Sequence, residues 1–289
     1  MKSVAALLCL LALATWAGPL HPAGDTLSVL RVPLLVLAAL AVIWTSWPRH
    51  LRWPLGGLCL LGLAQVGAMK WQVPAAGEVS VYQKNLWYRN READVLAADI
   101  LAQAPDLVTL QELSSHNQHV LNILRPVYPH QHLCTSRGWS VAVLSRHPVV
   151  PGSEMCSNGR GLAGVQVALP QGPVWVLSVH LLWPWPHDQR PQAQRLEQMV
   201  APLQGPIVMA GDFNMMPWGS DVRRLVRATG VRRAGPLSPT YWLNLLGWPF
   251  SIPLPLDQAY ATGGGTAAVR PLLGSDHAGV LAKVRLDAD

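Results

Sequence analysis

The apolar residues near the start of the chain fall into three long uncharged runs. These runs extend over about residues 3–20, 32–48 and 53–69, and polar segments separate them. A helix that crosses a membrane needs about 20 apolar residues, with a range of roughly 17–25, so each run reaches the lower limit. Backbone polar groups in lipid need internal partners, so the runs are expected to be helical. The pattern predicts a transmembrane anchor over residues 1–70.

The positive charges give this predicted anchor a direction. Lys2 and the pair Arg49 and Arg52 are expected in the cytoplasm, and the loop that contains Asp25 is expected outside. A third crossing then places everything after the anchor outside. The predicted localisation is therefore a multi-pass inner-membrane protein with an extracytoplasmic carboxy-terminal domain. Two alternatives stay open: the first run is a cleaved signal peptide ending near Ala12–Ala14, or all three runs are buried helices.

After a short linker at residues 71–78, strand-like and helix-like segments alternate to the end of the chain. Strands are predicted at 79–87, 106–113, 139–145, 164–169, 174–181, 207–211, 256–261 and 279–286. Helices are predicted at 90–104, 115–124, 189–203 and 221–228. Residues 79–289 suffice for one sizeable core. Strands mixed with a few helices indicate α/β or α+β layers.

Composition changes this picture mainly through its charge. Half of the 289 residues are apolar and only 13% are charged, whereas a typical soluble domain has about 25% charged residues. The net charge of +6 suggests a nucleic-acid partner at first. However, residues 1–77 contain five basic residues and one acidic residue, and the remainder contains 17 basic and 15 acidic residues. The domain after the linker is therefore close to neutral, which does not favour a basic nucleic-acid groove.

Polar residues at the ends of predicted apolar strands carry the chemical information. These residues are Asn85, Glu112, His180, Asp212, Asn214, Asp257, Asp276 and His277. A carboxylate buried at such a place costs several kcal/mol unless it is paired or binds a metal. Taken singly, each has an ordinary structural explanation, such as a turn or a strand cap. Taken together, they are a reasonable way to line a site.

The segments that contain these residues resemble the endonuclease/exonuclease/phosphatase family, which includes deoxyribonucleases, abasic-site endonucleases and neutral sphingomyelinases. The matching segments, in family order, are Tyr82–Leu86, Asp106–Glu112, Ser178–Leu181, Gly211–Asn214, Leu256–Asp257 and Gly274–His277. The resemblance covers residues 79–289 and suggests a membrane-anchored, bacterial-type member. It implies a four-layer α/β sandwich and hydrolysis of a phosphoester that depends on Mg²⁺, with Mn²⁺ as an alternative.

The resemblance also implies roles for the strand-end residues. Asn85, Glu112 and Asp276 are expected to bind the metal, since magnesium prefers oxygen ligands. The residues expected to act in catalysis are His180, Asp212, Asn214, Asp257 and His277. Phosphoryl transfer spreads negative charge over oxygen atoms, so protonated histidines would stabilise it.

Within that expected set, Asp212 would orient or deprotonate the attacking water, and Asn214 would hold the water or a phosphate oxygen. Asp257 would hydrogen-bond His277 and raise its pKa. Arg160 is expected to contact a substrate phosphate. Gln258 departs from the histidine or arginine that many members have after this aspartate, which puts the substrate in doubt.

Tryptophan-rich loops that follow the predicted site favour a lipid-like phosphoester near a bilayer, with a small phosphoester as an alternative, over nucleic acid. These loops are residues 181–186, 215–218 and 241–252. A membrane is thus the expected partner, and no obligate protein partner is evident. A membrane-tethered nuclease is the alternative, and an inactive scaffold is a third reading. If the domain is extracytoplasmic, Cys134 and Cys156 are expected to form a disulfide, whereas Cys9 and Cys59 lie in apolar runs.

Overall fold

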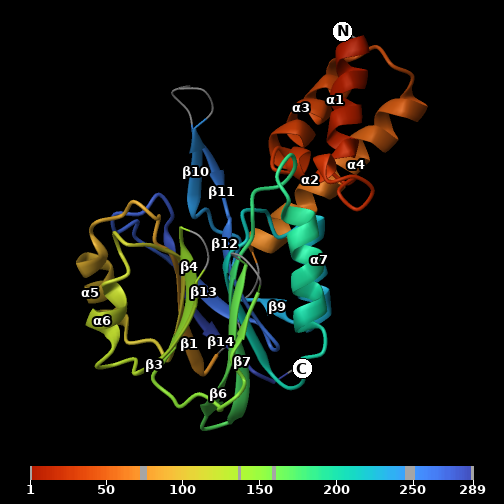
Figure 1. Ribbon diagram of the computed structural model, residues 1–289. Helices are drawn as coiled ribbons and strands as arrows, with labels where there is room; N and C mark the ends of the chain where they lie inside the picture. Colours follow the sequence, from red (N-terminus) through yellow and green to blue (C-terminus); the bar gives the residue numbers. More distant parts are fainter. Residues whose placement is uncertain (1, 72–76, 136–137, 158–160, 245–250, 288–289) are drawn as a thin grey trace.

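The computed structural model describes residues 2–71, 77–135, 138–157, 161–244 and 251–287. Two six-stranded sheets pack face to face, and helices cover the outer face of each sheet (Figure 1). These layers form the α/β sandwich that the family resemblance implies. Four helices at the amino terminus lie together beside one end of the sandwich.

The first sheet has the strand order β13-β14-β1-β2-β4-β3. Its strands are β13 (Gly265–Arg270), β14 (Gly279–Val284), β1 (Val79–Asn85), β2 (Leu107–Leu113), β4 (Ser140–Ser145) and β3 (His130–Thr135). Helices α5 (Ala93–Gln103) and α6 (Val120–Leu124) cover it, with Leu96 and Ile100 in a cluster with Tyr82. Strands β1 and β2 are parallel, so both end at the same edge of the sheet.

The second sheet has the strand order β5-β6-β7-β8-β12-β9. Its strands are β5 (Met155–Cys156), β6 (Leu162–Leu169), β7 (Gly172–His180), β8 (Ile207–Asp212), β12 (Asp257–Ala261) and β9 (Arg232–Arg233). Helices α7 (Gln189–Val200) and α8 (Ser220–Thr229) cover it, with Leu196 and Leu225 in its outer core cluster. A separate hairpin of β10 (Tyr241–Asn244) and β11 (Ser251–Leu254) projects from the sandwich (Figure 1).

Small and β-branched side chains fill the space between the two sheets. Val81 and Val143 of the first sheet and Val165 and Val208 of the second are fully or almost fully buried in one cluster. Such residues suit the pleated surface of a strand and pack closely across two sheets. The two sheets are therefore held in fixed relation, and the polar strand ends of both are brought to one edge.

The amino-terminal helices correct the prediction of a membrane anchor. They are α1 (Lys2–Ala14), α2 (Ala23–Ser28), α3 (Arg31–Trp44) and α4 (Arg49–Lys70). Within the described ranges, no helix combines the length and the apolar character needed to cross a membrane. The predicted three-span anchor and the multi-pass inner-membrane localisation are therefore wrong, and the extracytoplasmic placement that depended on them falls with them.

Helix length and composition explain this correction. α1 has 13 residues and α3 has 14, so each extends about 20 Å, whereas the hydrocarbon core is about 30 Å thick. α4 has 22 residues, but Arg52, Gln65 and several glycines lower its apolar character. The apolar runs pack instead on one another, with Leu35, Ala38 and Cys59 buried among the helices.

These helices also dock on the sandwich through polar contacts. The Asp25 carboxylate accepts hydrogen bonds from the backbone N–H and the hydroxyl of Ser220, the first residue of α8. The Trp218 indole N–H donates to the Ser28 carbonyl oxygen at 2.9 Å. The Thr26 hydroxyl donates to the Trp185 carbonyl oxygen at 2.5 Å. The amino-terminal helices thus contact the two loops that follow strands β7 and β8.

The predicted disulfide between Cys134 and Cys156 is present. Their Cα atoms are 5.5 Å apart, and the bond joins β3 to β5 across the edges of the two sheets. Cys9 and Cys59 are free and buried among the amino-terminal helices. The disulfide therefore provides a covalent link between the two sheets of the sandwich.

Candidate active site

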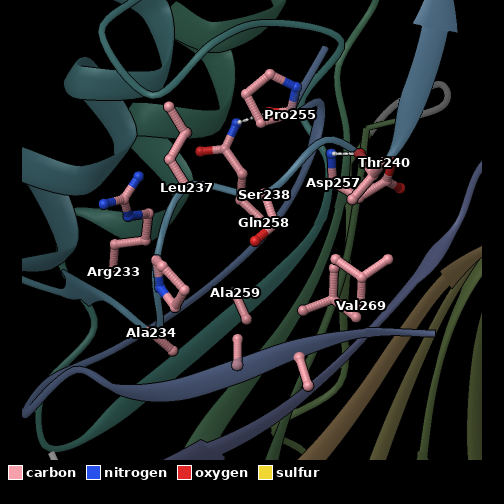
Figure 2. Close-up of a pocket in the computed structure, with 14 residues that line it drawn as sticks. Arg233, Ala234, Leu237, Ser238, Thr240, Pro255, Asp257, Gln258, Ala259 and Val269 are labelled. Atoms are coloured by element: carbon pink, nitrogen blue, oxygen red, sulfur yellow. Dashed lines mark hydrogen bonds between the residues drawn. The ribbon is translucent and has the colours of Figure 1, made fainter. Parts of the chain in front are cut away.

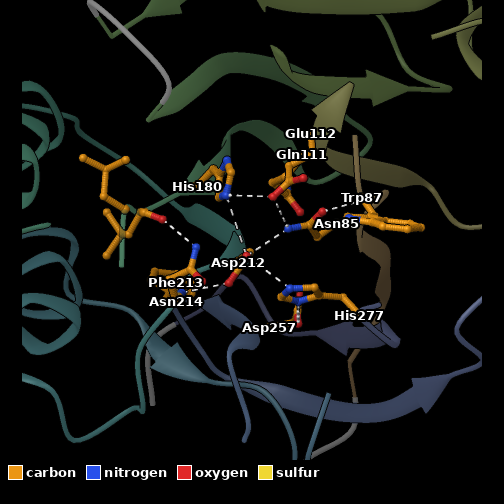
Figure 3. Close-up of polar contacts among 12 residues, drawn as sticks. Asn85, Trp87, Gln111, Glu112, His180, Asp212, Phe213, Asn214, Asp257 and His277 are labelled. Atoms are coloured by element: carbon orange, nitrogen blue, oxygen red, sulfur yellow. Dashed lines mark hydrogen bonds and ion pairs between the residues drawn. The ribbon is translucent and has the colours of Figure 1, made fainter. Parts of the chain in front are cut away.

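Strand register places three of the predicted site residues in one row. His180, the last residue of β7, is directly opposite Asp212 of β8, and Asp212 is directly opposite Asp257 of β12. Residues opposite one another on neighbouring strands have side chains on the same face. All three side chains are therefore presented together at the edge of the second sheet (Figure 3).

The first sheet contributes Asn85 and Glu112 to the same space. Asn85 ends β1, and Glu112 lies near the end of the parallel strand β2. The β2–β4 register shifts between Leu110 and Leu113, and Glu112 has a φ of 58°. A bulge re-aims a side chain, and positive φ at a residue other than glycine is strained, so both features are typical of functional sites. This irregularity lets the glutamate follow a buried strand and still reach the site.

Asn85 joins the two sheets at this edge. Its amide nitrogen donates to Asp212 Oδ2 at 2.9 Å and to Glu112 Oε1 at 3.2 Å. Its carbonyl oxygen accepts the Trp87 backbone N–H at 2.9 Å. In this arrangement Asn85 acts as a donor that holds two carboxylates together, and its carbonyl oxygen is already engaged.

Asp212 is one of the two almost completely buried acids of the site, together with Asp257. Its side chain is 1% exposed, and burial raises its pKa above the usual range. The charge of His277 and the hydrogen bonds from Asn85 and the Asn214 backbone N–H oppose that increase. Asn214, with a φ of 46°, also donates its side-chain amide to the Leu181 carbonyl oxygen. The turn after β8 thus fixes one oxygen of Asp212 and leaves the carboxylate directed toward the site.

Asp257 and His277 form a tight buried pair, as predicted. The distance from His277 Nδ1 to Asp257 Oδ2 is 2.7 Å. Burial alone would lower the pKa of His277, but the charges of Asp257 and Asp212 outweigh it and raise that pKa. Burial alone would raise the pKa of Asp257, but the adjacent imidazolium outweighs it and lowers that pKa. The pair therefore consists of a carboxylate and a protonated histidine at neutral pH.

The second histidine faces both carboxylates. His180 Nε2 lies 3.6 Å from Glu112 Oε1 and 3.7 Å from Asp212 Oδ2. His277 Nε2 approaches Asp212 Oδ2 from another direction, at 3.9 Å. The site therefore combines acids from both sheets with two imidazoles, and each imidazole can present an N–H to a bound oxyanion.

Three further residues named from the sequence have different outcomes. Asp276 is exposed, and its carboxyl group interacts electrostatically with His277, Glu112 and Asp257, so it lies at the border of the buried cluster. Arg160 lies outside the described residues. Gln258, which was expected to bear on substrate contacts, is 4% exposed and donates to the carbonyl oxygens of Met215 and Pro255. Its side chain therefore supports the backbone near the site and does not face the substrate.

Buried polar residues below the site were not anticipated from the sequence. The Gln83 amide donates to Asp257 Oδ1 at 2.8 Å and to Gln111 Oε1 at 2.9 Å, and Gln111 donates to Ser178 at 2.9 Å. Lys84 is completely buried and donates to the carbonyl oxygens of Pro271, Leu272 and His277. The sequence indicates this network only through the presence of polar residues inside otherwise apolar strands.

Aromatic residues border the cluster, and Trp139 lies outside the tryptophan-rich loops that the sequence singles out. The Tyr241 and His277 rings are 4.8 Å apart, and the Trp183 and Tyr241 rings are 5.9 Å apart. The Trp139 ring meets His180 edge-on at 6.3 Å. The site is therefore bordered by aromatic side chains from the loop after β7, the β10 hairpin and the start of β4.

A small cavity borders Asp257 and Gln258 behind the cluster (Figure 2). Thr240, Arg233 and Val269 also line it, and its volume is about 30 Å³. This is space for one or two water molecules. A phosphoester substrate would not fit in this cavity.

The donor set fits a hard divalent cation. Glu112 and Asp212 place carboxylate oxygens on either side of the Asn85 amide. In the described ranges, Asp212, Asp257 and His277 also offer ligand atoms within 4.8 Å of one another, although Asp257 and His277 already bond each other. Carboxylate oxygens are the ligands that magnesium prefers. Clustered buried carboxylates also need positive charge nearby, which a cation would supply.

Comparison with known proteins places this geometry among phosphoester hydrolases. Residues 82–277 match the model of the "Endonuclease/Exonuclease/phosphatase family". A search of curated proteins finds no match. A solved structure of TDP2 from C. elegans is 17% identical, with a TM-score of 0.56 over 87% of this chain and 91% of that one.

Two further solved structures have the same fold. A family protein from Leptotrichia buccalis is 15% identical, with a TM-score of 0.55 over 72% of this chain and all of that one. A variant of beta toxin from Staphylococcus aureus with bound magnesium ions is 13% identical, with a TM-score of 0.55 over 72% of this chain and 100% of that one. At these identities the likeness concerns the fold alone.

Proposed function

The chain belongs to the endonuclease/exonuclease/phosphatase family of metal-dependent phosphoester hydrolases, and we propose that it uses Mg²⁺ to hydrolyse a lipid-like phosphoester. The observation that carries the hydrolytic part is the meeting of Glu112, Asn85 and Asp212 from two sheets. The observation that favours a lipid-like substrate is the aromatic border of that cluster.

Glu112 would hold the cation, with Asp276 at the mouth and Asn85 positioning the glutamate. A bound magnesium ion would supply positive charge to the phosphate oxygens and favour ionisation of a bound water. The remaining chemistry belongs to side chains of the chain itself.

Asp212 is the proposed group that orients and deprotonates the attacking water. One of its oxygens is held by the Asn214 backbone N–H at 2.8 Å, and the other lies next to Asn85 and both histidines. A raised pKa brings a carboxylate closer to the basicity useful for general-base catalysis near neutral pH. Asn214 would restrain the same water through its side-chain oxygen, since its amide nitrogen is engaged by Leu181.

His277 and His180 would stabilise negative charge on the phosphate. His277 is held through Nδ1 by Asp257, so its Nε2–H is the end that faces the site. His180 presents Nε2 between the carboxylates of the two sheets. Donors fixed before the reaction stabilise developing oxyanion charge without a reorganisation cost, which is a large contribution in phosphoryl transfer.

The border of the site supports an amphiphilic substrate over a nucleic acid. Tyr241 contacts His277 with a tilted ring and meets Trp183 edge-on, and Trp185 and Trp242 are 47% and 43% exposed. Rings with an apolar body and a polar edge suit the boundary between a phosphate head and an apolar tail. Aromatic rings also stack on bases, so a nuclease is the second candidate.

Arg224 of α8 and Arg233 of β9 give that nuclease little support. Arg224 pairs with Glu197 at 2.6 Å, and Arg233 donates to the Met69 carbonyl oxygen at 2.8 Å. These two guanidinium groups hold the molecule together and are not arranged as a groove for a phosphate backbone. The same catalytic residues could also hydrolyse a small phosphoester that has no apolar tail.

A substrate panel tests the proposal directly. Purified full-length protein would be assayed with Mg²⁺ against a sphingolipid phosphodiester, a polyprenyl pyrophosphate, a short-chain phosphodiester and plasmid DNA. Fastest turnover of an amphiphilic phosphoester is expected. Far faster cleavage of DNA, with a steep salt dependence, would establish the nuclease instead.

Two variants separate the chemistry from the fold. His180→Ala and Asp212→Ala are each expected to lower kcat by about a hundredfold or more, as loss of a general acid or base does. Circular dichroism should show unchanged folding. Full activity in both variants, against every substrate, would refute the assignment of the site.

A further inference from the structure

An apolar groove with two arginines at its edge lies on the amino-terminal helices. Ala39, Val42 and Ile43 of α3 line one wall, and Trp53 and Leu60 of α4 line another. Its volume of about 530 Å³ is within the range of about 300–1,000 Å³ found for small-molecule pockets. It is separate from the strand-end cluster and shares no residue with it.

Two adjacent glycines form the floor of this groove. A Cβ atom at Gly56 or at Gly57 would meet no atom within 4 Å. The α4 backbone is therefore bare at this point, and the space above it stays open between larger side chains. A helix interior with two glycines loses about 1 kcal/mol of stability per glycine relative to alanine. The two glycines therefore keep the floor open although they lower the stability of the helix.

The walls are apolar and face solvent. Ile43 is 61% exposed, Trp53 is 77% exposed and Leu60 is 65% exposed. Isolated exposed apolar residues are common, but a contiguous concave group of them is typical of a binding site. An apolar chain that enters the groove would remove this surface from water at about 25 cal/mol per Å².

The charge at the groove is entirely positive. Arg49 and Arg52 both line it, and Arg52 donates one N–H to the Ile43 carbonyl oxygen at 2.8 Å. Within the described part of the chain, neither guanidinium pairs with a carboxylate. Asp25, the sole acid among residues 1–77, is engaged by Ser220 and Arg190 on the sandwich. Guanidinium groups bind phosphate and carboxylate with paired, charge-assisted hydrogen bonds.

The groove lies far from the catalytic cluster. The end of α2, just before α3 begins, and the end of α4 contact the sandwich, through Ser28 and Met69. Arg49 lies at the opposite end of both helices, about 20 Å further along α3 by its 14-residue length. Figure 1 shows the same arrangement, with the turn between α3 and α4 at the end remote from the sheets.

We propose that this groove binds a single anionic amphiphile, with the acidic head at Arg49 and Arg52 and the apolar tail over Gly56 and Gly57. A purely apolar ligand would leave the two arginines without an anionic partner from the ligand. An inorganic anion would leave the apolar walls exposed to water. The site is independent of the proposed hydrolysis, because it holds none of the groups that would perform it.

Binding of dodecylphosphonate to the full-length protein tests this inference, because its carbon–phosphorus bond resists phosphoester hydrolysis. Calorimetry and native mass spectrometry should show one molecule bound below the aggregation concentration of the probe. Methylphosphonate has the head alone and dodecanol has the tail alone, and each is expected to bind at least tenfold more weakly. Equal binding of either would overturn the proposal and indicate a simple anion site or a simple apolar site.

Variants locate the binding on the protein. The double variant Arg49→Ala/Arg52→Ala and the filling variant Gly57→Leu should each weaken binding at least tenfold. Gly57→Leu keeps both arginines and has open space for its side chain, so it tests the groove even if the double variant folds poorly. Arg195→Ala, on the exposed surface of α7, is the matched control and should bind normally. Unchanged binding by Gly57→Leu would overturn the assignment, as would self-association that occupies the groove.

Discussion

The Asp25 carboxylate accepts the Ser220 backbone N–H at 2.8 Å and so caps helix α8 from a distant part of the chain. α8 has no side-chain cap of its own, since Gly219 stands at the N-cap position. The same carboxylate lies 3.2 Å from Arg190, in the first turn of α7. One acidic residue of the amino-terminal helices thus holds the starts of both helices that cover the second sheet.

Replacing this acid should destabilise the protein. Asp25→Ala leaves the Ser220 N–H without its acceptor and removes a buried partner of Arg190, and the expected loss is about 2–4 kcal/mol of unfolding free energy. Chemical denaturation measures it. Glu154→Ala, at an exposed position, should stay within about 0.5 kcal/mol of the wild type. Equal stability of the two variants would show that the contact contributes nothing.

The Asp257–His277 pair should set the alkaline limit of activity. Because Asp257 raises the pKa of His277, the imidazolium of His277 persists to higher pH than usual. Activity that depends on this imidazolium should fall as pH rises through the raised pKa of His277. Asp257→Asn removes the main influence that raises the pKa, while burial still lowers it. The alkaline limb of the kcat/KM profile should then move to lower pH by about one unit or more. An unmoved limb would mean that His277 does not titrate in that step.

The same pair makes stability depend on pH, and the sign follows from each shift. The raised pKa of His277 contributes stability that is complete below its unfolded value of about 6.5 and is lost as pH rises through its folded value. The lowered pKa of Asp257 contributes stability above about 3.9 that is lost as pH falls through its folded value. Asp257→Asn should therefore flatten the melting temperature on both sides of neutral pH.

Removal of divalent metal should abolish hydrolysis. EDTA is expected to stop turnover, and added Mg²⁺ should restore it. Glu112→Gln keeps the shape of the side chain but removes a charged oxygen ligand, so half-maximal activity should require at least tenfold more Mg²⁺. His147→Gln is the control, since His147 follows the end of β4 that pairs with the start of β2, away from Glu112. This variant should need the same Mg²⁺ concentration as the wild type. Activity in EDTA equal to that in Mg²⁺ would exclude the proposed role of Glu112.

Reduction of the disulfide should lower the stability of the protein without changing the catalytic activity of the folded state. Cys134 and Cys156 are 22 positions apart, and closing a loop of that length restricts the unfolded chain by about 3 kcal/mol in the entropic description. A phosphine reductant should therefore lower the melting temperature of the wild type. The double variant Cys134→Ser/Cys156→Ser should already melt at the lower temperature and should not respond to the reductant.

The strand-end residues were predictable because they interrupt apolar runs. Asn85, His180 and Asp212 are each the last residue of a largely buried strand, and the sandwich brings all three together as expected. The start of α7 at Gln189, with Pro191 in the first turn, also agrees with the prediction. These features depend on local pattern, which is why the sequence is informative about them.

Other features depend on tertiary contacts that no local pattern encodes. The bulge at Glu112 and the ring contact between Tyr241 and His277 need segments far apart in sequence to meet. Strand β3 has an alternation too weak to be identified, because most of its residues are only partly buried. Hydropathy alone predicts membrane spans for the apolar runs, because it does not reveal that Arg31 starts a helix of only 14 residues.

The active cluster takes its groups from both sheets, so activity depends on the correct packing of one sheet on the other. Strands β1 and β2 hold Asn85 and Glu112, whereas β7, β8 and β12 hold His180, Asp212 and Asp257. A partly folded species with one intact sheet would keep its ladder of hydrogen bonds and much of its circular dichroism. It would possess no competent set of groups. Turnover therefore measures the docking of the sheets, and loss of activity on heating should precede loss of secondary structure.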